Sequence, residues 1–288
     1  MVMNAAFLKK VAGIKKIPTL PEVMQEVLST VASESSSATD IGAILLKDQA
    51  MCSRVLKMAN SAFYTQSRRI SNIEDAVVVL GFDEIVQLML ATTMFTAFDT
   101  TRLGGSLNMY GLWKHSMATA VTSKMIAERV GKCAERNLAY TAGLLHDIGK
   151  LVLANYFPED YAPVFKILET EDLFMYEAER VVLGFTHCDI SEWLLEQWNF
   201  PEGLIDTITS HHMNVRECHG VKSEILDVRL ANILCNQWEI GNGGNTKAYS
   251  AQIEDYSLLN LDEHNLDTME RKLREAETEI DLFLKTVV

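Results

Sequence analysis

One apolar stretch, residues 140–153, most constrains how this chain can fold. It reads Tyr-Thr-Ala-Gly-Leu-Leu-His-Asp-Ile-Gly-Lys-Leu-Val-Leu, and its flanks are apolar almost all round, which predicts a buried helix rather than a surface one. Within it, His146 and Asp147 are adjacent, and Lys150 follows one turn beyond the histidine. Burying two titratable groups side by side is costly unless a partner stabilises them, and a metal ion is the obvious partner. The stretch therefore predicts a buried metal anchor whose remaining ligands come from elsewhere in the chain.

Composition and charge limit the partners that the chain can have. Apolar residues make up 48% of the 288 residues and charged residues 23%, as in ordinary soluble globular proteins with one large or two modest domains. The formal charge of −13, without any basic stripe, argues against nucleic acid and against an anionic membrane surface as ligands. A phosphate ligand is compatible with this charge, because a local metal ion can dominate the field around it.

The cysteine pattern indicates a reducing compartment. The five cysteines are odd in number, scattered and without a Cys-x-x-Cys pair: Cys52, Cys133, Cys188, Cys218 and Cys235. Such a pattern disfavours a disulfide framework and a structural zinc knuckle. No apolar run is long enough to cross a bilayer, and Lys9 and Lys10 stand behind an apolar start, the wrong order for a secretory signal. We therefore expect a cytoplasmic protein.

Helical periodicity runs through the chain with few strand-like alternations, so we predict an all-α fold. Five short helices are expected in the N-terminal half, starting at Thr19, Ser37, Asp48, Ser71 and Asp83. Capping boxes mark the first two starts, and Gly81 closes the fourth helix because its missing Cβ suits a left-handed turn. The Phe63-Tyr64 pair with Arg68-Arg69 is interpreted as a surface turn, with a partner-binding surface as the less favoured reading.

Two loops and a terminal helix complete the expected organisation. Gly104-Gly105 separates the two halves, and the composition of residues 241–246 predicts a flexible loop. Beyond it, an apolar stripe steps by three and four residues: Leu266, Met269, Leu273, Ala276, Ile280, Phe283 and Val287. Three heptads are short for a coiled coil. A terminal helix that packs this stripe on the bundle is therefore favoured over a dimer seam.

Five of the seven histidines lie on or at the end of a predicted helix: His115, His146, His187, His211 and His212. His187 follows the capping residue Thr186, so its imidazole would project from a first helical turn, where N–H groups favour an anion. A lone helical histidine is usually a hydrogen-bonded core or surface residue, but five in this order with a partner aspartate favour a shared site. His219 and His264 stand in polar contexts and are expected to be solvated.

Several motifs resemble the HDOD family, a group of bacterial signalling proteins. They are Ile17-Pro-Thr-Leu-Pro, Ala59-Asn-Ser-Ala-Phe-Tyr and Ser71-Asn-Ile-Glu-Asp-Ala followed by Leu80-Gly81, in that order. The resemblance runs from about residue 17 to about residue 237. It implies an N-terminal helical bundle over 17–103, an HD-like metal-binding bundle over 107–240 and a C-terminal amphipathic helix over 261–288. The family is described mainly as regulatory, so the resemblance is more informative about fold than about chemistry.

The order His, His-Asp, His, His-His also resembles the HD superfamily and its HD-GYP phosphodiesterase branch. The resemblance implies a first metal site of His115, His146 and Asp147, and a second of His187, His211 and His212, with the aspartate bridging. Two such ions could activate a water and clamp a phosphodiester. In an enzyme, Asp147 and Lys150 would then be catalytic, since Lys150 resembles the lysine that steadies the phosphate as a point charge.

Two departures from that pattern weaken the step from metal binding to catalysis. The closing aspartate of the family is Asn232 here, whose carbonyl oxygen can bind a metal but brings no negative charge. HD-GYP enzymes have a glutamate one turn before the first histidine, and that position is Gly111 here. The Gly-Tyr-Pro signature is also missing, and Phe200-Pro201 is the most similar dipeptide. Imidazole-rich ligation suits iron, zinc or nickel, with manganese a further candidate, as one or two divalent ions. Cys188 is interpreted as a small apolar filler.

We therefore predict an HDOD-type signal-transduction or regulatory module with a metal-capable cleft and without efficient catalysis. The alternative is a metal-dependent phosphohydrolase or phosphodiesterase that acts on a nucleotide or cyclic dinucleotide, favoured by the complete histidine set and Lys150. The expected partners are a protein of a signalling pathway and a phosphate-containing small ligand, but neither nucleic acid nor a membrane. A homodimer is left open.

Overall fold

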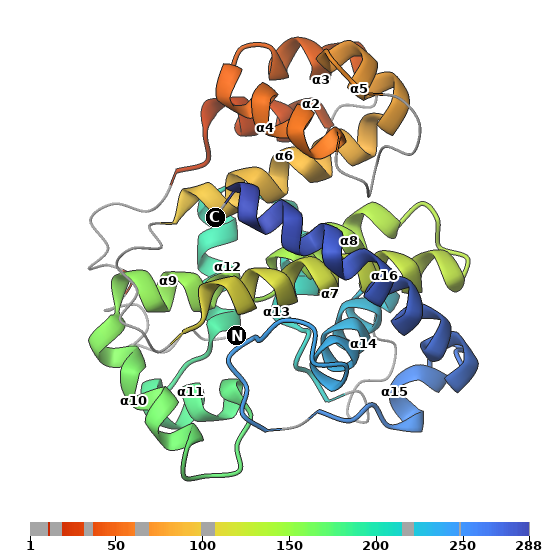
Figure 1. The fold of residues 1–288 in the computed structure, drawn as a ribbon. Helices are drawn as coiled ribbons and strands as arrows, with labels where there is room; N and C mark the ends of the chain where they lie inside the picture. Colours follow the sequence, from red (N-terminus) through yellow and green to blue (C-terminus); the bar gives the residue numbers. More distant parts are fainter. Residues whose placement is uncertain are drawn as a thin grey trace. The chain divides into compact units, whose positions relative to one another are not determined.

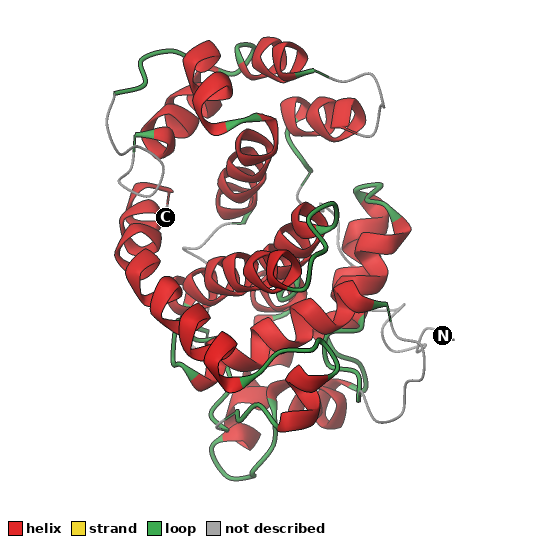
Figure 2. Ribbon diagram, turned by 90° about the vertical axis from the view of Figure 1, so that its right-hand side faces the viewer, coloured by secondary structure: helices red, strands yellow, loops and turns green. Residues whose placement is uncertain are grey.

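The structure is a computed structural model that describes residues 11, 19–31, 37–60, 69–98, 107–214, 222–247 and 249–287. Their arrangement divides into two compact units (Figure 1). The smaller unit comprises Pro18–Phe98 with Glu275–Val288, and the larger comprises Met1–Ile17 with Asp99–Arg274, within the described ranges. Helices and loops account for every described residue, without a strand among them (Figure 2), so the predicted all-α class is confirmed. The domain bounds predicted from the sequence stay a prediction.

Five short helices form most of the smaller unit, as predicted. They are α2 (Glu22–Val31), α3 (Ala38–Leu45), α4 (Gln49–Ala59), α5 (Ile73–Leu80) and α6 (Phe82–Ala97). Ser37 caps α3 in the expected capping box with Asp40. The cap predicted at Ser71 is wrong by one residue, because the Asn72 side chain accepts the Asp75 N–H at 2.6 Å. Gly81 ends α5 with φ +89° and ψ 165°, a glycine conformation but not the left-handed helical one.

Nine further helices of the described residues lie entirely within the larger unit. They are α7 (Met109–Arg129), α8 (Arg136–Leu145), α9 (Ile148–Tyr156), α10 (Pro158–Leu168), α11 (Met175–Leu183), α12 (His187–Gln197), α13 (Glu202–Thr209), α14 (Ser223–Gln237) and α15 (Ile253–Ser257). α7 packs against both α8 and α14, and α12 packs against both α9 and α13. α10 packs against α11. These contacts bring helices from distant parts of the sequence around one interior.

The single helix predicted over residues 140–153 is wrong in one respect, because the chain breaks at the His-Asp pair. α8 ends at Leu145 and α9 begins at Ile148, with His146 and Asp147 between them. Asp147 has φ −101° and ψ 10°, outside the helical region. α8 packs on α7 whereas α9 packs on α12, so the two helices have different neighbours. Both helices are buried, and the continuous apolar pattern therefore conceals the break.

The terminal helix α16 (Glu263–Val287) buries five of the seven residues of its predicted apolar stripe, and Leu266 is half-buried. The stripe residues Met269, Leu273, Ala276, Ile280 and Phe283 are buried. In the smaller unit, the ring centroids of Phe283 and Phe95 of α6 lie 5.2 Å apart. This burial agrees with the favoured interpretation of a terminal helix packed on its own chain.

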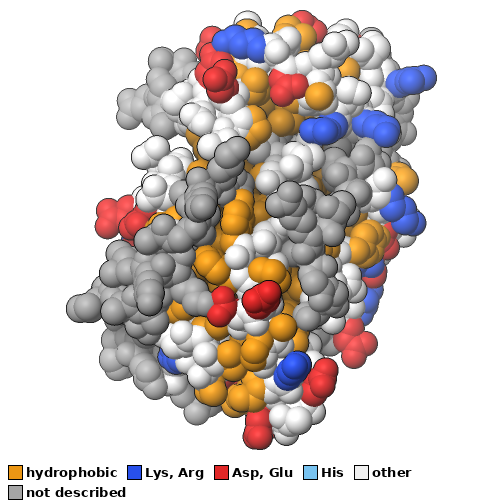
Figure 3. All heavy atoms as spheres, turned by 90° about the vertical axis from the view of Figure 1, so that its left-hand side faces the viewer, with side chains coloured by type: hydrophobic (Ala, Val, Ile, Leu, Met, Phe, Trp, Pro, Cys, Tyr) orange, Lys and Arg blue, Asp and Glu red, His pale blue; other side chains and the backbone are white. Residues whose placement is uncertain are grey.

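The described surface gives few further clues to a partner. On the face drawn in Figure 3, acidic and basic side chains are interspersed, and no histidine is visible among the described residues. Among these residues, no single helix has both the length and the apolar character to cross a membrane; only α5 and α6 together do, across a bend of 116°. Of the predicted surface turn, Phe63-Tyr64 and Arg68 lie outside the described residues, and Arg69 is exposed. The loop at Gly104-Gly105 and His219 also lie outside the described residues.

Candidate metal centre

The side chains predicted as ligands come from separate parts of the larger unit and meet in its interior. They are His115 in α7, His146 and Asp147 between α8 and α9, Lys150 in α9, His187 at the start of α12, His211 and His212 directly after α13, and Asn232 in α14. We call these side chains the His–Asp cluster. All are buried except His212, which is half-buried. His264, expected to be solvated, is exposed on α16.

Asp147 lies at the centre of the His–Asp cluster. Its Oδ2 is 3.3 Å from His146 Nε2 and accepts a hydrogen bond from Lys150 Nζ at 2.7 Å. Its Oδ1 is 3.3 Å from His187 Nε2 and 4.0 Å from His211 Nε2. Burial by itself raises the pKa of Asp147, but His146 and Lys150 lower that pKa well below its usual value. One ionised carboxylate therefore faces histidines of both predicted sites.

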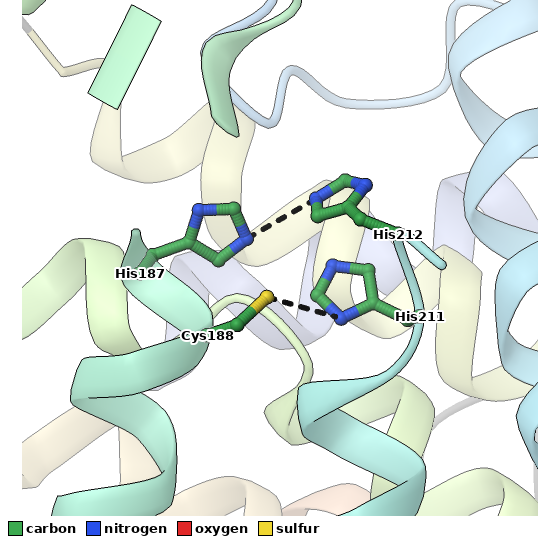
Figure 4. Close-up of side chains that lie close together, drawn as sticks. All are labelled: His187, Cys188, His211 and His212. Atoms are coloured by element: carbon green, nitrogen blue, oxygen red, sulfur yellow. Dashed lines mark hydrogen bonds between the residues drawn. The ribbon is translucent and has the colours of Figure 1, made fainter. Parts of the chain in front are cut away.

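The potential ligand atoms form two groups, and within each group all of these atoms lie within 4.8 Å of one another. The first group is His115, His146 and Asp147, and the second is His187, Cys188, His211 and His212. Figure 4 shows the second group, with its side chains directed toward one another. His212 Nε2 lies 3.2 Å from His187 Nε2, and Cys188 Sγ lies 3.9 Å from His211 Nδ1. The grouping follows the division that the HD resemblance implies, with a thiol added. The interpretation of Cys188 as an apolar filler did not predict that its thiol would lie among three histidines.

Hydrogen bonds fix how three of the imidazoles point. His146 Nδ1 lies 2.7 Å from Gly143 O, and His211 Nδ1 lies 2.5 Å from Ile208 O. Because a carbonyl oxygen only accepts, each Nδ1 carries the proton and each Nε2 is left with a free lone pair. His187 Nδ1 is held in the same way by the carboxylate of Glu179, at 2.6 Å. Metal-ligating histidines typically show this arrangement.

Several buried atoms of the His–Asp cluster lack a hydrogen-bond partner among the described residues. They are His146 Nε2, His211 Nε2, His115 Nδ1 and Asp147 Oδ1. Native proteins satisfy the great majority of their buried polar atoms, so each exception needs an explanation. Two of these atoms, His146 Nε2 and His211 Nε2, lie 3.3 Å and 4.0 Å from the carboxylate oxygens of Asp147. A cation bound there would satisfy them together with Asp147 Oδ1. The donor set therefore fits a metal ion.

Burial and mutual repulsion keep most of the imidazoles neutral, the form that binds metal. Burial, followed by the charge of His146, lowers the pKa of His115 to about 3. Burial also lowers the pKa values of His211 and His212 well below the usual value. His187 differs: burial acts to lower its pKa, but the Glu179 carboxylate raises it to about 10.

Residues 241–247, which we call the glycine loop, lie against the His–Asp cluster. Gly243 O accepts a hydrogen bond from Lys150 Nζ at 2.7 Å, and a Cβ on Gly243 would lie 3.1 Å from Asp147 Oδ2. Gly241 has φ +76°, and a Cβ there would lie 2.2 Å from His115 N. The glycines of this loop allow the backbone to approach the cluster closely.

The two departures from the HD-GYP pattern also have structural counterparts. Asn232 Oδ1 accepts a hydrogen bond from His115 Nε2 at 2.9 Å, and a second from Asn236 Nδ2 at 2.9 Å. Gly111 O accepts the Asn242 N–H of the glycine loop at 2.8 Å, and a Cβ on Gly111 would lie 3.1 Å from Asn242 Cβ. The loop therefore lies where a longer side chain at position 111 would need room.

Two residues near the cluster were missed by sequence reasoning. Glu179 of α11 and Tyr161 of α10 are both buried, and the tyrosine hydroxyl donates to Glu179 Oε1 at 2.6 Å. The available signal was the position of Glu179 on an apolar face, since Met175 and Ala178 of the same helix are also buried. A carboxylate on such a face needs a polar partner.

Comparison with known proteins places this architecture in a family. The family model for the HDOD domain matches residues 17–214. An uncharacterised protein of Treponema pallidum (strain Nichols) is 26% identical over 220 residues, which cover 76% of this chain and 42% of that protein. The chain thus spans less than half the length of that relative.

Solved structures agree with the family match. An HDOD domain protein of unknown function from Geobacter sulfurreducens has a TM-score of 0.81 at 25% identity, covering 98% of this chain and 97% of that one. A proposed phosphohydrolase from Shewanella amazonensis SB2B has a TM-score of 0.78 at 24% identity, covering 99% of each chain, and this likeness concerns the fold alone. With the family model matched over most of its length, the chain belongs to the HDOD domain family.

Proposed function

We propose that this chain is an HDOD-type regulatory module whose larger unit binds a divalent metal ion, and that it does not catalyse efficiently. The observation that carries the proposal is the set of unsatisfied buried atoms around Asp147, among them His146 Nε2 and His211 Nε2. Leaving a buried polar atom unpaired costs about 1–3 kcal/mol. A bound ion would offset several such costs at once, which explains why apolar side chains do not occupy these positions.

The donor atoms favour a transition metal over magnesium or calcium. Imidazole nitrogens dominate the His–Asp cluster, and Cys188 adds a thiol beside His211. Such donors suit zinc, iron or nickel, whereas magnesium and calcium prefer oxygen. When bound, the ion would supply a Lewis acid able to hold an anionic ligand such as a phosphate.

The polar side chains that a substrate would need are already hydrogen-bonded within the protein, which supports sensing or binding rather than turnover. Lys150 Nζ donates to both Asp147 and Gly243 O, so the lysine expected to steady a phosphate is already paired. Asn232 is engaged by His115 and contributes no negative charge. With the glycine loop against the cluster, a substrate would have to displace existing hydrogen bonds. We infer that the metal serves regulation, with a signalling protein as the partner.

A second candidate is a metal-dependent phosphohydrolase, favoured by one observation. Lys150 is buried at 2.7 Å from the carboxylate that faces both histidine groups. A cation at that point could neutralise a phosphate oxygen if the glycine loop moved away. Under this alternative, Asp147 and Lys150 would be catalytic.

Elemental analysis of the purified protein tests the metal proposal. We expect one or two equivalents of a transition metal per chain, with Asp147→Ala losing most of it because the shared carboxylate is gone. His264→Ala is the matched control, since that exposed histidine lies outside the cluster, and it should retain the metal. A wild-type protein that is metal-free after purification without chelators, and that takes up no Zn²⁺, Fe²⁺ or Ni²⁺ when these ions are added, would contradict both candidates. Hydrolysis of a generic phosphodiester by metal-loaded protein, abolished by His146→Ala, would favour the enzyme over the regulatory module.

A further inference from the structure

We infer that Glu179 and Tyr161 form a positioning pair that fixes the orientation of His187 and thereby sets the metal affinity of the second histidine group. The inference rests on the proposed metal function. It assigns roles to two residues that lie outside both groups of potential ligands.

The contacts between these residues are short and fully enclosed. Glu179 Oε2 accepts two hydrogen bonds from His187, one from the backbone N–H at 2.8 Å and one from Nδ1 at 2.6 Å. Glu179 Oε1 accepts the Tyr161 hydroxyl at 2.6 Å. Glu179 and His187 are 0% exposed and Tyr161 is 1% exposed. Both carboxylate oxygens are therefore engaged without help from solvent.

This geometry determines which nitrogen of His187 faces the cluster. The carboxylate accepts a hydrogen bond from Nδ1–H, so Nε2 is the nitrogen directed at Asp147 Oδ1, 3.3 Å away, and at His212 Nε2 (Figure 4). The second bond, to the backbone N–H, anchors the carboxylate to the first turn of α12, where a helix favours an anion. The ring and the helix end are thus held by one group.

Glu179 also supplies charge that the ligand set lacks. Asn232 brings no negative charge where the HD family has an aspartate, and carboxylates hydrogen-bonded to ligating histidines make those ligands more basic. A buried carboxylate is costly in a role that packing alone could fill, because an apolar pair would pack the same space without desolvation. Its position is explained by the imidazole that it orients.

The test compares Glu179→Gln with the wild-type protein in two measurements. The first is affinity for Zn²⁺ and Co²⁺ by competition with a chelator, where we expect about 10- to 100-fold weaker binding. The second is the ¹⁵N chemical shifts of the His187 ring in metal-free protein. In the wild type they should report a protonated Nδ1, in the charged ring as in the neutral one, and in the variant a mixed tautomer. Glu196→Gln, the same change at an exposed residue of α12, is the matched control and should change neither.

Tyr161→Phe provides an independent variant, expected to weaken metal binding in the same direction by a smaller factor. If Glu179→Gln does not fold, as judged by circular dichroism, Tyr161→Phe decides on the same readouts. A folded Glu179→Gln with wild-type affinity and an unchanged His187 tautomer would overturn the inference. If the wild type binds no metal, the proposed function fails, and the tautomer measurement still decides whether Glu179 positions His187.

Discussion

At the scale of single residues, the His–Asp cluster depends on the ion pair between Asp147 and Lys150. Both side chains are buried, and their contact at 2.7 Å partly neutralises the carboxylate within an apolar surround. Removing one partner of a buried ion pair is far more costly than removing both, since the remaining charge loses its compensation. A metal ion bound to Asp147 would replace that compensation.

Lys150→Met should therefore destabilise metal-free protein much more than metal-loaded protein. We expect a loss of about 3–5 kcal/mol in the free energy of unfolding when a chelator is present. The loss should be clearly smaller with bound metal, because the ion then neutralises Asp147. Urea denaturation with and without chelator measures both values. Lys166→Met, at an exposed lysine of α10, controls for the substitution, and equal losses in both conditions for Lys150→Met would argue against a metal on Asp147.

The residues of the cluster differ in how far the sequence could predict them. The histidines could be picked out as a group because their order along the chain matches a known family pattern, and each lies on or at the end of a predicted helix. Glu179 could not, since its contact with His187 arises from how α11 packs beside the start of α12. Tyr161 is a further step away, on α10. Tertiary packing creates these contacts, and no local pattern records them.

At the scale of helices, α9 and α12 approach each other at a glycine. A Cβ on Gly149 would lie 2.0 Å from His187 O, and the Gly149 N–H donates to Ser191 Oγ at 3.0 Å. Ser191 Oγ in turn donates to His187 O at 2.9 Å. The first turn of α9, which follows Asp147, is thereby locked to the first turn of α12, which carries His187.

Gly149→Ala should push α9 and α12 apart and disturb the His–Asp cluster. The methyl group meets backbone that cannot rotate aside, so we expect destabilisation of about 1–3 kcal/mol, the usual cost of overpacking, together with weaker metal binding. Gly203→Ala in α13 is the matched control. A Cβ there has nothing within 4 Å, so the change should be neutral or stabilising by up to about 1 kcal/mol. Thermal denaturation and chelator competition measure both effects, and similar results for the two variants would contradict the close-packing argument.

Helix starts were more predictable than helix breaks. Capping boxes at Ser37 and Thr186 placed two starts correctly, because the cap is a contact between residues three apart. The cap predicted at Thr19 is wrong, since α2 begins at Glu22. The break at His146 and Asp147 was not predictable, since both flanking helices are buried and the apolar pattern continues across it. The glycine loop shows the same limit: composition indicates freedom of the backbone but not the surface against which it is held.

At the scale of the whole molecule, every residue of the His–Asp cluster belongs to one of the two compact units. The cluster, Glu179, Tyr161 and the glycine loop all fall within Asp99–Arg274. The HDOD match over residues 17–214, by contrast, extends into both units. Metal binding should therefore depend on the integrity of the larger unit, whereas the family fold requires both.

A substitution in the smaller unit tests whether metal binding depends on the larger unit alone. Phe283 is 5% exposed and contacts Phe95, so Phe283→Ala should destabilise that unit by about 3–5 kcal/mol through the cavity it leaves. We expect metal content to be unchanged under conditions in which the variant is folded, because no ligand lies in that unit.

Leu282→Ala, at the neighbouring residue that is 52% exposed, is the matched control and should alter stability little. Calorimetry and elemental analysis measure the two properties on one sample. Loss of metal from folded Phe283→Ala would mean that the centre depends on both units, because the damaged residue and the ligands lie in different ones.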